Sequence, residues 1–202
     1  MNNLDEKLLK IKEEAILKHV PILNDESLQY ILVMLNIIKP NKILEIGTAV
    51  GYSASNFSKY LYGENSKITS IEIKENMYKK SLENIEYLGL TDKIEVVLAD
   101  ATVYLKNIDE KQINYDVIFI DAAKGQYIKF LEEAIRLIRP GGVIIADNVL
   151  FKGRVMSDYN DHKHRTAVNR LREYIDIINS DSRLNSTVLD IGDGVAITVV
   201  NK

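Results

Sequence analysis

Residues 42–55 read "KILEIGTAVGYSAS", which begins as a short apolar strand and ends as the first turn of a helix. Gly47 and Gly51 fall in the turn between them, where glycine lets the backbone approach a ligand closely. Dinucleotide-binding folds place their glycines as G-x-G-x-x-G, whereas the spacing here is E-x-G-x-x-x-G. This spacing favours a ligand without a pyrophosphate over NAD, and a plain tight turn is the alternative interpretation.

The same change from strand to helix recurs along the chain. Strands are predicted over residues 42–46, 67–71, 93–98, 116–120, 142–146, 186–191 and 195–200. Helices are predicted over residues 4–17, 28–38, 53–60, 75–88, 101–108, 126–138 and 164–178. The alternation predicts an α/β fold with seven strands, mostly parallel, and helices on both faces of the sheet. The letters "GDG" between the last two strands predict an antiparallel hairpin at its edge.

Composition limits the class of protein. With 202 residues, 46% of them hydrophobic, the chain can form one compact domain over residues 1–202, in which residues 1–39 make an N-terminal helical cap. No apolar run reaches the roughly 20 residues of a membrane-spanning helix, so we expect a cytoplasmic protein without a membrane partner. The absence of cysteine excludes disulfides, thiolate metal sites and cysteine nucleophiles. Any chemistry must therefore use oxygen and nitrogen groups.

Acidic residues lie at the ends of the first three predicted strands. Glu45 lies just inside the first strand, and Glu72 and Asp100 end the second and third. In nucleoside-binding α/β folds a carboxylate in the position of Glu72 accepts from the ribose hydroxyls, and Asp100 could accept from an adenine amino group. Each acid could instead cap a helix, Asp100 before Ala101 in particular. Three acids at three successive strand ends favour the nucleoside interpretation.

The fourth and fifth predicted strands end in "FIDAAKG" and "IIADNV", which contain Asp121, Lys124, Asp147 and Asn148. If these strands are neighbours, two carboxylates and an amide oxygen converge at one edge of the sheet. Carboxylates that close repel each other unless a proton or a cation lies between them, and an all-oxygen set suits Mg²⁺. The alternative is that Asp121 caps the next helix while Asp147 and Asn148 form a turn.

Basic residues gather between residues 152 and 172. Six of them stand against the acidic Asp158 and Asp161, which gives this segment a charge of +4 and leaves −7 for the rest of a chain whose net charge is −3. The six are Lys152, Arg154, Lys163, Arg165, Arg170 and Arg172. Such a run is either a solvated helix face or a patch that contacts phosphates.

Taken together, the motifs resemble a known family. "ILEIGTAVGYSA", "SIEI", "LADA", "YDVIFIDAAKGQY" and "GGVIIADNVLFKG" are similar to class I, S-adenosylmethionine-dependent, metal-requiring O-methyltransferases, which include catechol and caffeoyl-CoA methyltransferases. Within that family, "FIDAAKGQY" and "DNVLFKG" most resemble the bacterial tRNA 5-hydroxyuridine methyltransferases, which make 5-methoxyuridine at the wobble position. The resemblance implies the Rossmann-like class I methyltransferase fold, S-adenosylmethionine and Mg²⁺ as cofactors, and a homodimer.

The resemblance also implies a role for each matching residue. The residues implied to bind S-adenosylmethionine are Leu23, Glu45, Gly47, Gly51, Ser53, Glu72, Asp100, Ala101 and Asp121. Asp121, Asp147 and Asn148 are implied to bind the metal, and Lys124 is the implied catalytic residue. If the acceptor is a tRNA anticodon loop, the basic segment is expected to contact its phosphates through Lys152, Arg154, Lys163 and Arg165.

The implied reaction limits the acceptor. A divalent cation can stabilise a deprotonated acceptor oxygen, and a lysine beside it can remove the proton. The acceptor should then present two adjacent oxygens, as catechols do, or as 5-hydroxyuracil does with its 5-hydroxyl and 4-carbonyl. A tRNA methyltransferase is our first hypothesis. A small-molecule catechol or caffeoyl-CoA type enzyme and a non-catalytic nucleoside- or tRNA-binding module are the alternatives.

Overall fold

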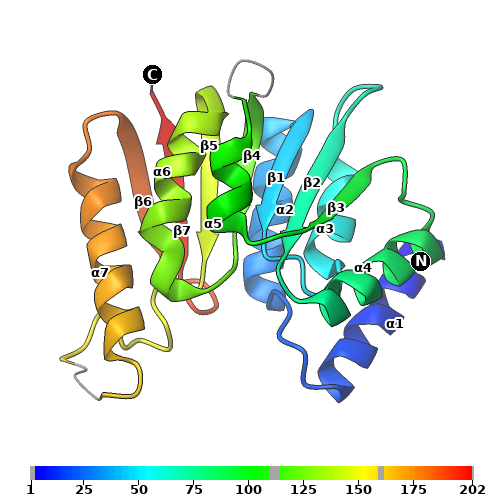
Figure 1. Ribbon diagram of the computed structural model, residues 1–202, viewed down its shortest axis with the longest axis horizontal. Helices are drawn as coiled ribbons and strands as arrows, with labels where there is room; N and C mark the ends of the chain where they lie inside the picture. Colours follow the sequence, from blue (N-terminus) through cyan, green and yellow to red (C-terminus); the bar gives the residue numbers. More distant parts are fainter. Residues whose placement is uncertain (1–2, 110–113, 159–161, 202) are drawn as a thin grey trace. The chain divides into compact units, whose positions relative to one another are not determined.

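A computed structural model describes residues 3–109, 114–158 and 162–201 (Figure 1). Seven strands occur within these described residues, in the order β3-β2-β1-β4-β5-β7-β6. This mixed, mostly parallel arrangement confirms the predicted fold class. The chain divides into two compact units, Met1–Ala101 (unit 1) and Thr102–Lys202 (unit 2), which we describe separately. That residues 1–202 form one domain stays a prediction.

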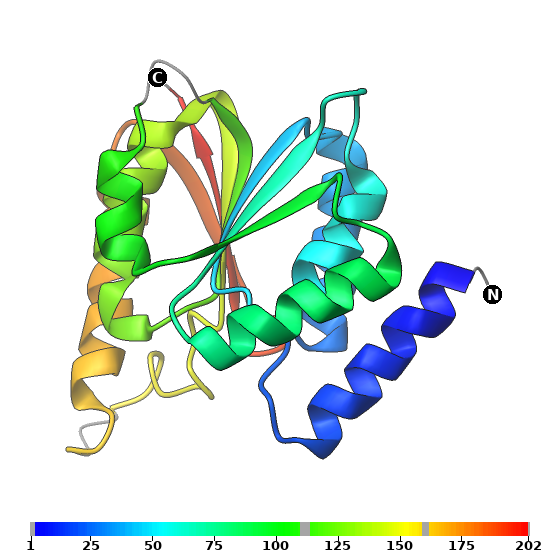
Figure 2. The ribbon, with the colours of Figure 1, turned by 45° about the vertical axis from the view of Figure 1, so that its right-hand side comes forward.

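Unit 1 contains three parallel strands and the helices that cover one of their faces. Its elements are α1 (Asn3–Leu17), α2 (Asp25–Ile38), β1 (Lys42–Ile46), α3 (Tyr52–Phe57), η1 (Ser58–Tyr60), β2 (Lys67–Glu72), α4 (Glu75–Leu88) and β3 (Ile94–Leu98). β2 pairs with β1 on one side and with β3 on the other, both in parallel. Helices α2, α3 and α4 lie on the same side of these strands, and α1 packs outside them against α3 and α4 (Figure 2).

Unit 2 contains the other four strands. After α5 (Ala101–Tyr104), which begins at the last residue of unit 1, its elements are η2 (Leu105–Asn107), β4 (Tyr115–Ile120), η3 (Lys124–Gln126), α6 (Tyr127–Leu137), β5 (Ile138–Asp147), α7 (Arg165–Ser180), β6 (Leu184–Leu189) and β7 (Val195–Val200). β4 and β5 are parallel, whereas β7 is antiparallel to both β5 and β6. The predicted C-terminal hairpin is therefore confirmed, with β6 at the edge. Helices α6 and α7 pack against each other.

Some boundaries differ from the predicted ones. β6 ends at Leu189 rather than at residue 191 because the following residues form a turn that the connection after β5 holds in place. In that turn the carbonyl oxygens of Asp193 and Gly194 accept from the backbone N–H groups of Leu150 and Val149, each at 3.0 Å. β5 begins at residue 138, four residues earlier than predicted. Pro140 does not prevent this, because a proline near the start of a strand removes only one of the hydrogen bonds between neighbouring strands.

The strands supply much of the buried core. Ile43 and Leu44 of β1 are completely buried, as are Ile118 and Ile120 of β4, which is the pattern of parallel strands covered on both faces. The helices are amphipathic, and those of the described residues are all too short or too polar to cross a membrane.

Gly194 is expected to tolerate no side chain. Its φ is +88°, and an added Cβ would lie 2.7 Å from Leu150 Cβ and 2.8 Å from the Leu150 backbone nitrogen. Gly194→Ala should therefore lower the free energy of unfolding, measured in urea, by about 2–4 kcal/mol. The matched control is Gly153→Ala, where φ is +71° but a Cβ would meet nothing within 4 Å, so that the loss should be about 1 kcal/mol. Equal losses in the two variants would contradict this interpretation.

Candidate functional site

The turn between β1 and α3 has the backbone conformation that its glycines predict. Gly47 and Gly51 have φ values of +101° and +78°, and Ala49 between them is also left-handed at +47°, which is uncommon for a residue with a side chain. The buried Asn84 side chain of α4 donates to the Val50 carbonyl oxygen at 2.9 Å. The turn is therefore fastened to α4.

Glu72 lies at the end of β2 and clamps this turn. One of its carboxylate oxygens accepts from the Ala49 N–H and the other from the Lys74 N–H, both at 2.8 Å. The side chain is 7% exposed. The sequence predicted a ribose contact for Glu72, which stays a prediction, but missed its contact with Ala49, because residues 23 positions apart give no local signal.

Glu45 is completely buried. Its two carboxylate oxygens accept from the hydroxyls of Ser53 and Ser70, and the Ser70 hydroxyl also contacts that of Thr48. The sequence analysis named Ser53 but missed Ser70 and Thr48. Ser70 is the direct cross-strand partner of Glu45 in the β1–β2 register, so only the strand pairing reveals it.

Three further predicted residues of unit 1 lie near chain turns. Leu23 is buried in the connection before α2, whose first turn is capped by Asn24. Asp100 is exposed directly before α5, and Ala101 is the first residue of that helix. This is the position that both interpretations of Asp100 require, so helix capping and adenine recognition both stay open.

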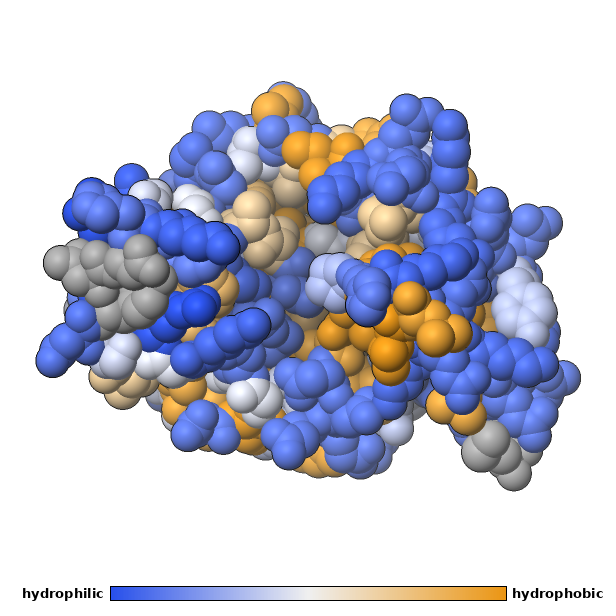
Figure 3. Space-filling view, turned by 90° about the horizontal axis from the view of Figure 1, so that it is seen from below, coloured by the Kyte–Doolittle hydropathy of each residue, from blue (hydrophilic) through white to orange (hydrophobic). Residues whose placement is uncertain are grey.

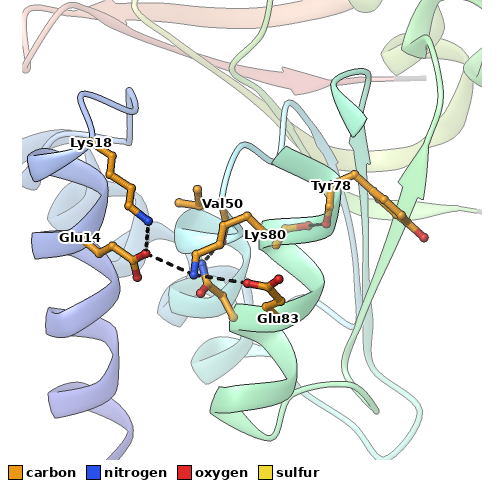
Figure 4. A network of polar contacts seen from close by, with 8 residues as sticks. Glu14, Lys18, Val50, Tyr78, Lys80 and Glu83 are labelled. Atoms are coloured by element: carbon orange, nitrogen blue, oxygen red, sulfur yellow. Dashed lines mark hydrogen bonds and ion pairs between the residues drawn. The ribbon is translucent and has the colours of Figure 1, made fainter. Parts of the chain in front are cut away.

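A polar cleft of about 370 Å³ lies between α1 and α4. In it the Lys80 ammonium lies 3.3 Å from Glu14 and 3.5 Å from Glu83, and Lys18 pairs with Glu14 at 2.6 Å (Figure 4). These charges of opposite sign pair with one another, so the network connects α1 to α4.

In unit 2, the ends of β4 and β5 bring together the predicted metal ligands. The two strands are parallel neighbours, with Ile120 opposite Ala146, so that Asp121 and Asp147 follow at the same edge. Asp147 is completely buried, and its carboxylate accepts from the Asn148 side-chain amide. The two strands are therefore neighbours, as the expected convergence requires, while the role of the three residues as metal ligands stays a prediction.

Lys124 lies at this edge within a chain of hydrogen bonds. Its ammonium is 3.6 Å from Asp121 Oδ1 and donates to the Tyr127 hydroxyl at 3.0 Å. That hydroxyl donates in turn to the main-chain oxygen of Asp147 at 2.7 Å. Burial, with the carboxylates of Asp121 and Asp147 nearby, raises the pKa of Tyr127 well above its usual value, which keeps the hydroxyl protonated.

Tyr127 is a residue that sequence reasoning missed. Its place in "FIDAAKGQY" gave no reason to expect a role in methyl transfer, because the Asp147 carbonyl that it contacts is 20 residues away. The ring is completely buried and packs edge-on against Tyr174 of α7, with centroids 5.7 Å apart.

The chemistry of this donor set fits a divalent cation. Asp121, Asp147 and Asn148 offer only carboxylate and amide oxygens, which Mg²⁺ prefers. Across residues 3–109, 114–158 and 162–201 there is no group of three or more histidine, cysteine, aspartate or glutamate side chains that could hold a metal. The predicted metal ligands do not form a group of this kind, because only Asp121 and Asp147 belong to these residue types and the third, Asn148, is an amide.

The basic residues of the 152–172 segment differ in their surroundings. The Arg172 guanidinium donates to the main-chain oxygens of Arg154, Val155 and Ser157, so it supports the loop rather than offering a free charge. Arg170 pairs with Glu173 at 2.7 Å.

Of the four predicted tRNA contacts, three lie in the connection from β5 to α7, and Arg165 is the first residue of α7. Hydrophilic side chains gather at this end of unit 2 (Figure 3). Lys152, Lys163 and Arg165 are exposed, whereas the half-buried Arg154 stacks on the Phe151 ring at 5.1 Å. Asp161, which was counted in the charge of this segment, lies outside the described residues.

Comparison with known proteins identifies close structural and sequence relatives. A family model described as O-methyltransferase matches residues 2–202. The caffeoyl-CoA O-methyltransferase of Stellaria longipes is 32% identical over 175 residues, 83% of this chain and 71% of that protein. The catechol O-methyltransferase of Niastella koreensis is 28% identical over 178 residues, 85% of this chain and 79% of that protein. An O-methyltransferase from Bacillus cereus, crystallised in complex with SAH, has a TM-score of 0.85 and 28% identity, and the match covers 100% of this chain and 92% of that chain.

The Ser70 hydroxyl should stabilise the fold through the buried Glu45 carboxylate. Ser70→Ala leaves one carboxylate oxygen without this donor, so the free energy of unfolding should fall by about 1.5–3 kcal/mol. Ser58→Ala is the matched control, because that hydroxyl is equally buried but donates to a neutral carbonyl, and about 0.5–1.5 kcal/mol is expected. Urea unfolding of both variants measures the difference. A smaller loss for Ser70→Ala than for Ser58→Ala would contradict the assignment.

Proposed function

This chain belongs to the O-methyltransferase family and is an S-adenosylmethionine-dependent enzyme, and from that premise we propose that it methylates a small molecule with two adjacent oxygens, of the catechol or caffeoyl type. The observation that supports this acceptor most directly is the edge formed by β4 and β5. There Asp121, Asp147 and Asn148 supply oxygen ligands suited to chelation, and Lys124 lies beside them.

We assign the binding of S-adenosylmethionine to unit 1. The left-handed glycine turn after β1 lets the cofactor approach the backbone, and Glu72 can accept from the ribose hydroxyls with the lone pairs that its two backbone contacts leave. The remaining proposed contacts are Glu45 and Ser53 for the methionine end, the Leu23 backbone, and Asp100 with Ala101 for the adenine. The SAH in the Bacillus cereus relative supports S-adenosylmethionine as the cofactor.

We assign the acceptor to the residues of unit 2. Mg²⁺ held by Asp121, Asp147 and Asn148 would, when bound, stabilise negative charge on the acceptor oxygen. Lys124 takes the proton from the acceptor hydroxyl and later releases it to solvent. The oxygen then attacks the methyl carbon of the sulfonium in line, so that an O–C bond forms as the S–C bond breaks. The products are the methyl ether and S-adenosylhomocysteine.

The choice of a small acceptor over other O-methyltransferase substrates rests on two considerations. The names of the relatives, caffeoyl-CoA and catechol O-methyltransferase, belong to enzymes of small acceptors and support the same class here. A chelating acceptor also needs a second oxygen next to the one that is methylated, which vicinal diols on an aromatic ring provide.

Lys124→Met should abolish most of the activity. With labelled S-adenosylmethionine, Mg²⁺ and 3,4-dihydroxybenzoate as the probe, kcat should fall by about 10²–10⁴-fold, because the acceptor loses its general base. Lys129→Met, an exposed lysine on α6, is the matched control and should leave kcat unchanged. 4-Hydroxybenzoate, which lacks the second oxygen, should not be methylated. Full activity of Lys124→Met, or equal turnover of both probes, would rule the mechanism out.

A second candidate acceptor is 5-hydroxyuridine at the wobble position of tRNA. 5-Hydroxyuracil presents the same pair of adjacent oxygens, and a base in a single-stranded loop can be turned out into a pocket. The specific observation in its favour is the exposure of Lys152, Lys163 and Arg165, which could contact the phosphates of the anticodon loop. Arg154 is a less direct candidate because it stacks on Phe151. A homodimer and a cytoplasmic location stay predictions.

The salt dependence of tRNA binding tests this second acceptor. If the three exposed basic residues contact phosphates, replacing all three with alanine should reduce the slope of log K against log salt by about 2–3. Lys79→Ala is the control, since that exposed lysine belongs to unit 1 and pairs with Glu75 at 2.7 Å. Fluorescence anisotropy with labelled anticodon stem-loop between 50 and 200 mM salt, roughly the range over which phosphate contacts respond, measures the slopes. An unchanged slope in the triple variant would count against tRNA.

A further inference from the structure

We propose that Tyr127 is a positioning residue of the methyl transfer, which holds the Lys124 amine at the edge of β4 and β5 by bridging it to the main chain of Asp147. The inference rests on the proposed function, because Lys124 is the proposed base. In this role the Tyr127 hydroxyl takes no part in the methyl transfer itself, but it determines where the amine of Lys124 lies.

The distances identify Tyr127 as the group that directs the amine. Lys124 Nζ donates to the Tyr127 hydroxyl at 3.0 Å, whereas its distance to Asp121 Oδ1 is 3.6 Å. The first is a normal hydrogen bond and the second is too long for one. The same ammonium lies 5.2 Å from the centroid of the Tyr127 ring, so the ring adds a cation–π contact. Asp121 therefore attracts the charge, and Tyr127 sets its position.

The turn that carries Lys124 cannot fix the position of the amine by itself. Lys124 begins the short turn η3, whose neighbouring residues Ala123 and Gly125 are exposed. A lysine side chain has a flexible four-carbon stem, and about 2 kcal/mol of rotamer freedom opposes any single placement of its amine. A fixed external partner is needed to hold it.

Tyr127 is such a partner because its own position is determined by packing. It is the first residue of α6, its side chain is completely buried, and its ring meets the Tyr174 ring edge-on at an interplanar angle of 79°. Its hydroxyl can accept one hydrogen bond and donate another, and it does both here, toward Lys124 and toward the main-chain oxygen of Asp147. Phenylalanine would keep the ring and lose both bonds.

Tyr127→Phe and Tyr174→Phe form a matched pair of variants. Both remove one hydroxyl from a fully buried ring of the same cluster, but within the described residues the Tyr174 hydroxyl has no hydrogen-bond partner. Tyr127→Phe should lower kcat by about 10- to 100-fold through loss of orientation, with the KM for S-adenosylmethionine unchanged. Tyr174→Phe should leave both constants at the wild-type values. A wild-type kcat in folded Tyr127→Phe overturns the proposal.

A second test, the chemical labelling of lysines, does not depend on catalytic activity. Competitive labelling of lysines with acetic anhydride, resolved by mass spectrometry, reports the accessibility of the Lys124 amine relative to the exposed Lys129. In the wild type Lys124 should react more slowly than Lys129, and in Tyr127→Phe, but not in Tyr174→Phe, its rate should rise several-fold. A Lys124 that reacts as fast as Lys129 in the wild type overturns the proposal even if the variant does not fold. If no acceptor is methylated, the proposed function fails, while the labelling still decides whether Tyr127 positions Lys124.

Discussion

Burial of carboxylates at the carboxyl ends of parallel strands is the constraint on which the candidate site depends. Glu45, Glu72 and Asp147 lie at or near the ends of β1, β2 and β5, and each is at most 7% exposed. A buried carboxylate is costly unless donors surround it. Both oxygens of Glu45 and of Glu72 have donors, namely two serine hydroxyls and two backbone N–H groups. One carboxylate oxygen of Asp147 accepts from the Asn148 amide.

In unit 1 this requirement shapes the turn to which we assign cofactor binding. The bond from the Ala49 N–H to Glu72 stabilises a left-handed residue between two glycines, and Asn84 fastens the next carbonyl to α4. Contacts inside the protein therefore maintain the conformation of the turn. A preorganised turn loses less conformational freedom when S-adenosylmethionine binds, which favours affinity.

In unit 2 a buried main-chain oxygen at the end of β5 imposes a comparable requirement. The main-chain oxygen of Asp147 is buried and accepts from Tyr127, so a hydroxyl that satisfies the backbone also holds the Lys124 amine. Lys124 lies on a short turn, and its side chain has a flexible four-carbon stem. One side chain, Tyr127, thus bonds both to a buried backbone oxygen and to the amine that we propose as the base, and its ring packs against Tyr174.

The sequence by itself determined the α/β class, the bounds of β1, α4 and β7, and the acidic residues at the strand ends, because periodicity and turn residues are local properties. Only the tertiary structure decided which side chains meet across the chain. Ser70 lies beside Glu45 through strand register, Tyr127 reaches a carbonyl 20 residues away, and Arg172 supports a loop that composition had suggested as a binding patch. Register and packing arise from the whole core, and no local pattern encodes them.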